Sequence, residues 1–231
     1  QVTDAPHGAL FGSISPDGKY VYVLKDQNGD EHGHFVRIPF SGGKAIDTTP
    51  NLPPYFSYSV STSTHNDVLC FTATLEGKNK MFIVPCHQNT FESPREVYAT
   101  AASLSDPICS SDGRYVCVAE TDNSARGSTL LLIANDTSNG SIPMRSRVFD
   151  ALIPLAFSHI ADSPTVFALA RRGRWYRPIF YNFARKRISE ISHHLFRGDV
   201  WVLRWDEDRG TILLCDVYEA RQTLYLYDMR T

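Results

Sequence analysis

The most informative stretch of this sequence is Ser15-Pro-Asp-Gly-Lys-Tyr-Val-Tyr-Val23, a tight turn leading into a strand. Proline presets the backbone φ needed early in such a turn, and glycine accepts the positive φ needed later in it. The tyrosines and valines that follow favour an extended strand. The same arrangement returns in Ser110-Ser-Asp-Gly-Arg-Tyr-Val-Cys-Val118. Two distant parts of the chain are therefore predicted to fold in the same way.

Three looser copies extend this pattern along the chain. They are His65-Asn-Asp-Val-Leu-Cys-Phe71, Ala161-Asp-Ser-Pro-Thr-Val-Phe167 and Glu207-Asp-Arg-Gly-Thr-Ile-Leu213. Across the five copies the aspartates are Asp17, Asp67, Asp112, Asp162 and Asp208, at separations of 50, 45, 50 and 46 residues. A nearly constant period in this range indicates one supersecondary unit repeated along the chain.

Each repeat is predicted to form four short strands joined by hairpin turns. In the first repeat the predicted strands cover residues 9–14, 20–24, 34–39 and 44–48. No segment places apolar residues at i, i+3, i+4 and i+7 over a dozen positions, so no helix is predicted. Four-stranded units repeated without helices are typical of β-propeller blades. The predicted fold is therefore all-β, a β-propeller of four-stranded antiparallel blades; the competing β-sandwich does not require a constant period.

The repeat divides the chain into blades within one predicted domain, 1–231. Their approximate bounds are 7–50, 51–100, 101–150, 151–195 and 196–231. We expect the inner strand of the second blade at 55–59 and the outer strand of the third at 147–149. The last blade has three predicted strands, and neither chain end supplies a fourth. Because a ring normally completes its last blade, we expect about five blades of a seven- or eight-bladed propeller.

Composition narrows the possible partners and surroundings of the chain. Of its 231 residues 42% are hydrophobic and 21% charged, an ordinary globular balance, and the net charge of −2 argues against nucleic acid or an anionic membrane as a partner. No apolar run approaches the length of about 18 residues that a membrane-spanning helix needs, and the first residues do not form a signal peptide. The five cysteines include no Cys-x-x-Cys pair. Free buried thiols in a reducing, cytoplasmic compartment are therefore expected.

Several motifs resemble a known family of propellers. Asp26-Gln-Asn-Gly-Asp-Glu31, a strand ending in Arg37-Ile-Pro-Phe40, and Gly42-Gly43 resemble the first blades of the propeller in prolyl oligopeptidase family serine peptidases and hydrolases, such as acylaminoacyl-peptidases and dipeptidyl-peptidases. The family's Leu-Thr outer edge is matched only in part, by Ile46-Asp47-Thr48-Thr49. Ser105-Asp-Pro107 and Gln222-Thr-Leu-Tyr-Leu-Tyr-Asp228 look like parts of further blades. The resemblance covers the chain at blade level, although periplasmic Tol-type propellers share the Ser-Pro-Asp-Gly turns.

The resemblance implies a function that lies outside these residues. Members of the family carry an α/β-hydrolase domain whose nucleophilic serine sits in a Gly-x-Ser-x-Gly motif. This sequence contains no such motif, so no catalytic residue is assigned, and no metal or cofactor is expected. The implied role is a non-catalytic propeller segment that gates access of a peptide or small ester substrate. Its implied partner is a covalently linked α/β-hydrolase domain that is not in this chain.

The loop Asp30-Glu31-His32-Gly33-His34 is the first candidate contact site. It holds two carboxylates and two imidazoles within five residues. Such groups bind metals, but the spacing is not a known zinc pattern. The alternatives are a solvated hairpin loop and a polar contact with a hydrolase domain or with the charged end of a substrate.

The second candidate is a basic, aromatic stretch. Arg171-Arg172-Gly173-Arg174-Trp175-Tyr-Arg177 and Arg185-Lys-Arg187 are predicted to form one basic hairpin. It could be a solvated blade edge, a docking site for an acidic protein face or a substrate carboxylate, or a surface for nucleic acid. Overall charge disfavours the last of these.

The repeated aspartates leave two further functions open. In five-bladed glycosidases carboxylates converge at the ring centre, and the turn aspartates could be mistaken for such acids. The local interpretation is that each side chain accepts hydrogen bonds from nearby backbone N–H groups. His193-His194 is interpreted as a polar turn between blades. The alternatives to a gating segment are thus a stand-alone protein-interaction propeller and a five-bladed glycosidase-like enzyme.

Overall fold

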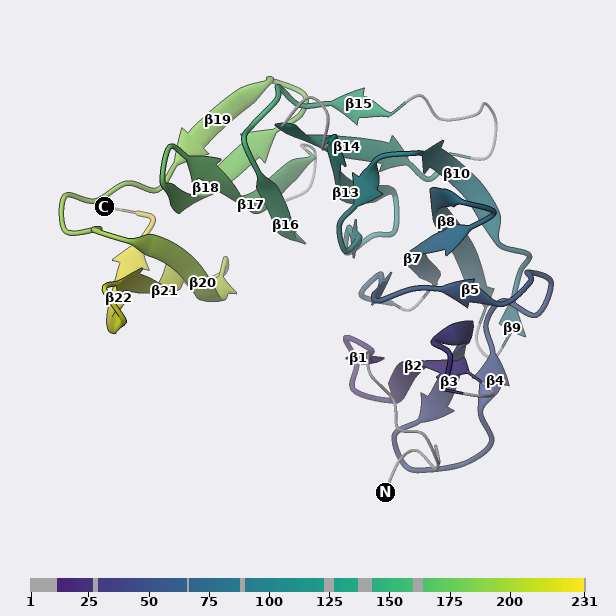
Figure 1. The fold of residues 1–231 in the computed structure, drawn as a ribbon. Coiled ribbons are helices and arrows are strands. Elements are labelled where there is room, and N and C mark those ends of the chain that lie inside the picture. The colour runs from purple at the N-terminus through teal and green to yellow at the C-terminus, as the bar shows by residue number, and fades with distance from the viewer. Residues whose placement is uncertain are drawn as a thin grey trace.

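The fold consists of antiparallel strands stacked in successive blades around an arc (Figure 1). The computed structural model describes residues 12–26, 29–65, 67–87, 90–122, 127–136, 143–159 and 164–230. Within these residues every element is a strand, and every strand pair is antiparallel. The predicted all-β propeller fold is confirmed. No helix in the described residues has the length and apolarity to cross a lipid bilayer.

The first two blades share one continuous sheet. The first contains β1 (Gly12–Ile14), β2 (Tyr20–Asp26), β3 (His32–Pro39) and β4 (Ile46–Asp47). The second contains β5 (Tyr55–Phe56), β6 (Val60–Thr62), β7 (Val68–Leu75), β8 (Lys78–His87), β9 (Thr90–Phe91) and β10 (Arg95–Thr100). Pairing of β3 with β5 joins the two blades.

The remaining blades form separate sheets. The third contains β11 (Ser103–Leu104), β12 (Ile108–Cys109), β13 (Tyr115–Asp122), β14 (Gly127–Ala134) and β15 (Met144–Arg145). The fourth contains β16 (Leu152–Phe157), β17 (Thr165–Arg172), β18 (Trp175–Asn182) and β19 (Arg187–Glu190). The fifth contains β20 (Asp199–Asp206), β21 (Thr211–Tyr218) and β22 (Arg221–Asp228). The labels β1, β16 and β20 mark strands near the centre of the arc in Figure 1.

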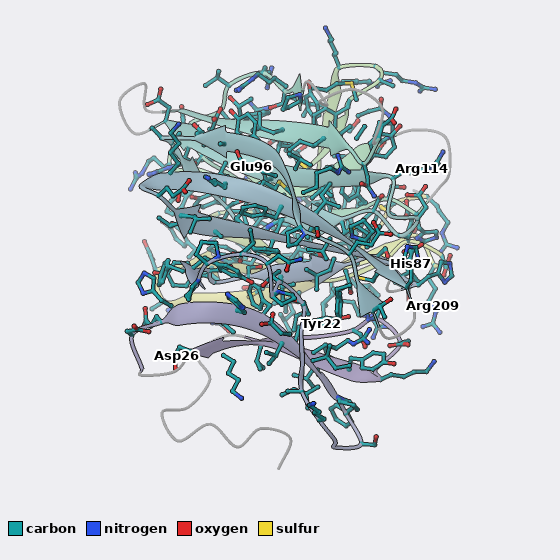
Figure 2. All side chains as sticks on the ribbon, turned by 90° about the vertical axis from the view of Figure 1, so that its right-hand side faces the viewer. Tyr22, Asp26, His87, Glu96, Arg114 and Arg209 are labelled. Atoms are coloured by element: carbon teal, nitrogen blue, oxygen red, sulfur yellow. The ribbon has the colours of Figure 1, made fainter. Side chains whose placement is uncertain are left out.

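Because neighbouring strands are antiparallel, the arc has two distinct faces. The long hairpins β2–β3, β7–β8, β13–β14, β17–β18 and β21–β22 all turn on one face, here called the hairpin face. The Ser-x-Asp turns lie on the opposite face, here called the turn face. Figure 2 shows Asp26, at the end of β2, on one side of the molecule and Arg114 and Arg209 on the other. Loops distant in sequence therefore share one face.

The repeated serine–aspartate turns have the same hydrogen bonds in the first and third blades. Ser15 Oγ donates to Asp17 Oδ1 over 2.7 Å and accepts the N–H of Tyr20 over 2.9 Å. Ser110 Oγ makes the equivalent bonds to Asp112 and from Tyr115 at the same two distances. Asp17 and Asp112 also accept the backbone N–H groups of Lys19 and Arg114, so their structural interpretation is confirmed.

Two other turn aspartates have different surroundings. Asp67 accepts a short hydrogen bond from Ser63 Oγ, so it also serves its own turn. The interpretation of Asp208 is wrong: its carboxylate lies 3.0 Å from His159 Nε2, and Asp206 Oδ1 instead accepts the Arg209 N–H over 3.0 Å. The β20–β21 turn is thus closed by the residue that ends β20. Asp162 lies outside the described residues.

Apolar side chains on both faces of the middle strands hold the blades together. On β13, Val116 and Val118 pack in a cluster with the second blade, whereas Cys117 and Ala119 pack in a cluster with the fourth. This division follows from the two-residue side-chain period of a strand. Burying one valine- or leucine-sized side chain contributes roughly 1.5–3 kcal/mol before entropy is counted. β13 therefore stabilises two interfaces.

A buried arginine connects the first two blades. Arg37 on β3 is 1% exposed, and its Cζ lies 4.4 Å from the ring centroid of Tyr20 and 4.6 Å from that of Phe91. A guanidinium between aromatic rings gains cation–π attraction of about 2 kcal/mol when desolvated. Burial raises the pKa of the adjacent Tyr22 to about 12, so its hydroxyl stays protonated at neutral pH. Arg37 thus contacts rings from both blades.

Polar groups also connect the second blade to the third. Tyr98 on β10 donates to Glu120 Oε1 over 2.5 Å, and Arg145 donates to Glu120 Oε2 and to the Tyr98 hydroxyl, each over 2.7 Å. Burial alone would raise the pKa of Glu120, but the hydrogen bonds from Tyr98 and Arg145 hold that pKa below its ordinary value. The ionised carboxylate is therefore the form that joins the blades.

Two predicted strands are wrong in their details. The expected inner strand at 55–59 is divided: β5 pairs with both β3 and β7, and β6 is the segment that lies beside β7 as an inner strand. The expected outer strand at 147–149 is replaced by β15 and a single bridge between Ser128 and Phe149. In both places the chain passes between blades, where pairing depends on distant strands.

The five cysteines are free thiols, and four of them are buried. Burial raises the pKa of Cys86 to about 12 and that of Cys117 further above its ordinary value. Cys109 is partly buried. Cys86 and Cys117 are therefore protonated packing groups at neutral pH.

The fifth blade leaves apolar side chains exposed on the sheet face opposite its packed side. Leu224 and Leu226 on β22 are 62% and 74% exposed, and Trp201 and Leu203 on β20 are also exposed. In the other direction, Val200, Ile212 and Leu214 pack against the fourth blade. This sheet therefore has apolar residues on both faces, as the middle blades do.

Replacing Ser110 with alanine should destabilise the protein by about 1–2 kcal/mol, because the partly buried Tyr115 N–H loses its acceptor and Asp112 loses a donor. Urea denaturation measures this change. The control is Ser111→Ala, one residue away, for which we expect a change within about 0.5 kcal/mol. Equal losses in the two variants would contradict the assigned turn geometry.

The Glu120→Gln variant should lose part of the acid sensitivity of the protein. A carboxyl whose pKa is lowered by folding adds stability above its unfolded pKa, and this contribution disappears as the pH falls through the folded pKa. The unfolding free energy of the unmodified protein should thus fall on acidification below about pH 4.5, and that of the variant should fall less. Denaturation series at several pH values test this, and parallel pH profiles would refute it.

Candidate functional site

The loop between β2 and β3 is shaped by a single aspartate. Asp26 accepts the Gly29 N–H at Oδ1 over 3.3 Å and the Glu31 N–H at Oδ2 over 3.1 Å. Glu31 has a φ of 61°, in the left-handed region that non-glycine residues seldom adopt. The loop then enters β3 with the His32 N–H donating to Asp30 Oδ1 over 3.1 Å. Hydrogen bonds from backbone N–H groups to the Asp26 and Asp30 carboxylates therefore order the acidic loop.

Close packing of β2 against β3 fixes the position of the two histidines. A Cβ atom added to Gly33 would lie 2.0 Å from the carbonyl oxygen of Lys25. No side chain fits there, so the strands approach each other at this point. His32 and His34 flank this glycine and lie near the hairpin face.

A pocket of about 410 Å³ opens beside this loop on the first blade. Its polar lining comes from β2, the loop, β3 and β4, and Val36, Ala45 and Pro54 supply apolar surface. The polar lining residues are Lys25, Asp30, His32, His34 and Asp47. The pocket thus combines opposite charges with an apolar wall, which suits a small polar group or the end of a peptide.

His34 is the most strongly positioned polar group in this pocket. Its Nδ1 lies 2.8 Å from Asp47 Oδ2, and Asp47 Oδ1 accepts the Thr49 N–H over 2.8 Å. The ring stacks on Tyr55 with centroids 5.7 Å apart and planes inclined by 16°. In the neutral ring that donates from Nδ1, Nε2 is an acceptor. Nε2 is buried and has no hydrogen-bond partner among the described residues.

The fold therefore places three of the four residues of the first predicted site in one pocket. Asp30, His32 and His34 line one pocket, whereas the exposed Glu31 does not line it and contributes backbone shape. Sequence reasoning missed Lys25 and Asp47. Asp47 could have been found from a β3–β4 pairing, because Val36 and Asp47 are partners in that register. Contact of these residues with a substrate or a second domain stays a prediction.

The second predicted site is divided by the fold. The β17–β18 turn at 173–174 lies on the hairpin face, whereas the turn at 183–186 lies on the turn face. The eight residues of β18 separate them by about 25 Å. The prediction that Arg185, Lys186 and Arg187 join Arg171–Arg177 in one basic hairpin is wrong, because β18 passes from one face to the other.

Within the hairpin-face part, the basic residues have different surroundings. Arg172 Nε lies 3.3 Å from Glu190 Oε2, and its Cζ lies 5.3 Å from the Phe149 ring. Trp175 makes an edge contact with Tyr218 of the fifth blade at 6.1 Å. Arg171 and Arg174 are exposed. Arg172 and Trp175 thus pack within the protein, and Arg171 and Arg174 face solvent.

Carboxylates on the inner strands are engaged in local structure. In the described strands β1, β6, β12, β16 and β20, the acidic residues are Asp199 and Asp206. Asp199 accepts the Tyr176 N–H over 2.7 Å, and Asp206 accepts the Arg209 N–H. These inner strands therefore place no pair of carboxylates free for glycoside chemistry. Across the described residues, no group of three or more His, Cys, Asp or Glu side chains is arranged to hold a metal ion.

Comparison with known proteins relates the chain to others by fold. No protein-family model matches the sequence, and no curated protein sequence matches it. Prolyl oligopeptidase B from Galerina marginata, bound to a 35mer substrate, has a TM-score of 0.72 and 13% identity, covering 96% of this chain and 33% of that chain. TolB from Acinetobacter baumannii has a TM-score of 0.61 and 11% identity, covering 97% and 55%.

Two further solved structures extend the range of similar proteins. Putative TolB from Agrobacterium tumefaciens has a TM-score of 0.65 and 15% identity, covering 99% of this chain and 79% of that chain. Oligogalacturonate lyase in complex with manganese has a TM-score of 0.66 and 10% identity, covering 95% and 61%. The predicted resemblance to prolyl oligopeptidase and Tol-type propellers is confirmed at the level of the fold. The chain spans about half of the Acinetobacter TolB and about a third of prolyl oligopeptidase B.

Replacing Gly33 with alanine should cost about 3 kcal/mol or more, because the new Cβ would force β2 away from β3. The matched control is Gly18→Ala. Gly18 has a φ of 70° and open space around its Cβ position, so that variant should lose only about 1 kcal/mol from backbone strain. Chemical denaturation gives both values. A Gly33→Ala loss no larger than the control's would contradict the close strand approach.

Proposed function

We propose that this chain is a non-catalytic propeller segment of a prolyl oligopeptidase-like serine hydrolase. In this role it restricts substrate access and docks the α/β-hydrolase domain. The observation that carries the proposal is the comparison with prolyl oligopeptidase B, which covers 96% of this chain but 33% of that chain. The absence of a Gly-x-Ser-x-Gly motif from this sequence agrees with a catalytic serine located elsewhere.

The hairpin face is the surface proposed to meet the hydrolase domain and its substrate. The pocket beside His34 lies toward this face, and its polar groups suit the charged end of a peptide or a small ester. The turn face is less suited, because serine and aspartate side chains there close their own turns. Asp30, His32, His34 and the exposed Arg171 and Arg174 are the proposed contacts.

The proposed parent ring contains further blades, seven or eight in total. The exposed apolar face of the fifth blade supports this, because Leu224 and Leu226 occupy a sheet face of the kind that packs on a neighbouring blade elsewhere. The free cysteines suit a reducing compartment such as the cytoplasm.

A stand-alone protein-interaction propeller is the second candidate. It is favoured by putative TolB from Agrobacterium tumefaciens, because the match covers 99% of this chain and 79% of that chain. That protein is thus not much longer than the matched region.

Labelling of the natural full-length protein with a fluorophosphonate probe distinguishes the two candidates. A serine hydrolase should be labelled on one serine outside residues 1–231, and it should cleave short peptides while leaving folded proteins intact. The Asp30→Ala and His34→Ala variants should lower kcat/KM for charged peptides, and Lys19→Ala on the turn face should not. A natural protein that contains no hydrolase motif and remains unlabelled would overturn the proposal in favour of the second candidate.

A further inference from the structure

Three exposed arginines gather on the hairpin face where the fourth blade meets the fifth. Arg174 lies in the β17–β18 turn, Arg197 precedes β20, and Arg221 begins β22. Each is exposed. These three residues with Tyr218 are here called the arginine cluster. It lies apart from the pocket on the first blade and draws on two blades and the connection between them.

Tyr218 links two of the three arginines, Arg174 and Arg221. The Cζ of Arg174 lies 5.3 Å from the ring centroid of Trp175, and Trp175 contacts the Tyr218 ring edge-on at 6.1 Å. Arg221 is the direct cross-strand partner of Tyr218. Partners in antiparallel strands have Cβ atoms about 5 Å apart. Arg174 is thereby connected to Tyr218 through Trp175, and Arg221 lies beside Tyr218 on the neighbouring strand.

The third arginine is positioned by its backbone. Asp216 is 5% exposed and accepts the N–H of Arg197 over 3.0 Å and that of Gly198 over 2.8 Å. A Cβ added to Gly198 would lie 1.8 Å from the Val217 carbonyl oxygen, so this segment lies tightly against β21 next to Tyr218. A buried carboxylate therefore fixes the chain that carries Arg197.

Two nearby carboxylates are directed at backbone N–H groups, and within the described part of the chain no ion pair joins them to the arginines of the cluster. Asp216 is buried and bound to backbone N–H groups, and Asp199 is bound to the Tyr176 N–H. Glu219 raises the pKa of Tyr218 through a hydrogen bond, while Arg197 and Arg174 act on it in the opposite direction. Among the described residues, none of the three arginines forms an ion pair with a carboxylate. Glu219 is thus the exposed carboxylate next to Tyr218, beside three exposed arginines.

We propose that the arginine cluster is a docking site for an acidic polypeptide segment rich in Asp and Glu. Arginine binds carboxylates through two parallel hydrogen bonds, and its planar guanidinium loses less side-chain entropy per hydrogen bond than a lysine ammonium does. The site does not depend on whether a hydrolase domain accompanies the propeller.

The surroundings of the aromatic rings favour a polypeptide over nucleic acid. Single-stranded nucleic acid binds such surfaces by stacking bases on free aromatic faces. Here Arg174 lies over the Trp175 ring, and the Tyr218 ring is engaged edge-on by Trp175. In addition, the net charge of −2 gives the whole chain no long-range attraction for a polyanion. A short acidic segment needs only the local charge of the cluster.

Binding of a fluorescein-labelled octaglutamate peptide to the 1–231 chain tests this proposal by fluorescence anisotropy. The unmodified chain should bind the peptide, and the affinity should fall as salt rises. The double variant Arg174→Gln with Arg197→Gln should bind roughly tenfold or more weakly. Its thermal unfolding should be unchanged, because both side chains are exposed. If it folds poorly, Arg221→Gln alone should still weaken binding severalfold.

The matched control is Arg185→Gln with Arg187→Gln, which removes two exposed arginines from the turn face. This control should bind octaglutamate as the unmodified chain does. Three outcomes would overturn the proposal: no binding by the unmodified chain, equal losses in the control and the cluster variants, or unchanged binding in the cluster variants. Tighter binding of an octathymidine oligonucleotide than of octaglutamate would also overturn it, in favour of a nucleic-acid surface.

Discussion

Stacking of sheets face to face is the constraint on which the rest of this structure depends. A blade inside the arc has a neighbour on each side, so its middle strands must bury apolar residues on both faces. On β14, Leu130 and Leu132 pack toward the fourth blade, whereas Leu131 and Ile133 pack toward the second. This requirement explains the unbroken apolar run in the sequence, which a sheet with one solvated face would not need. It also confines polar chemistry to strand ends, edges and loops.

The two faces of the arc use those strand ends differently. On the turn face, the hydroxyls of Ser15 and Ser110 each bind a strand N–H group and an aspartate. These polar groups therefore already have hydrogen-bond partners within the turns. On the hairpin face the long hairpins close through backbone conformation, as at Glu31 and Gly173, where φ is positive. Asp26 and Asp30 also accept backbone N–H groups of the β2–β3 loop, whereas the side chains of His34 and Arg174 take no part in closing a turn. Both candidate sites therefore lie toward the hairpin face.

This division also explains what the sequence could predict. The repeats and the Ser-x-Asp turns depend on residues within five positions of one another, so local patterns revealed them. The division of the predicted 55–59 strand could not be seen, because β5 pairs with strands of two blades. Asp208 resembles the other turn aspartates by position, yet its partner is His159 from the preceding blade. Both features depend on contacts with parts of the chain that are distant in sequence.

The same reasoning applies to the sites. Asp30, His32 and His34 are close in sequence and were found together, but Asp47 reaches His34 only through the pairing of β3 with β4. Arg197 and Tyr218 are likewise distant in sequence from residues 171–177, beside which they lie in the structure.

The distribution of charge on the hairpin face has a consequence for binding. Asp26, Asp30 and Glu31 make the first blade acidic there, whereas the arginine cluster makes the junction of the fourth and fifth blades basic. The net charge of the whole chain, −2, does not reveal these two regions of opposite charge. A partner that covers this face would meet both signs at fixed positions around the arc. Complementary charges on that partner would then select one rotational orientation, because the other orientations bring like charges together. The face is thus suited to orienting its partner as well as holding it.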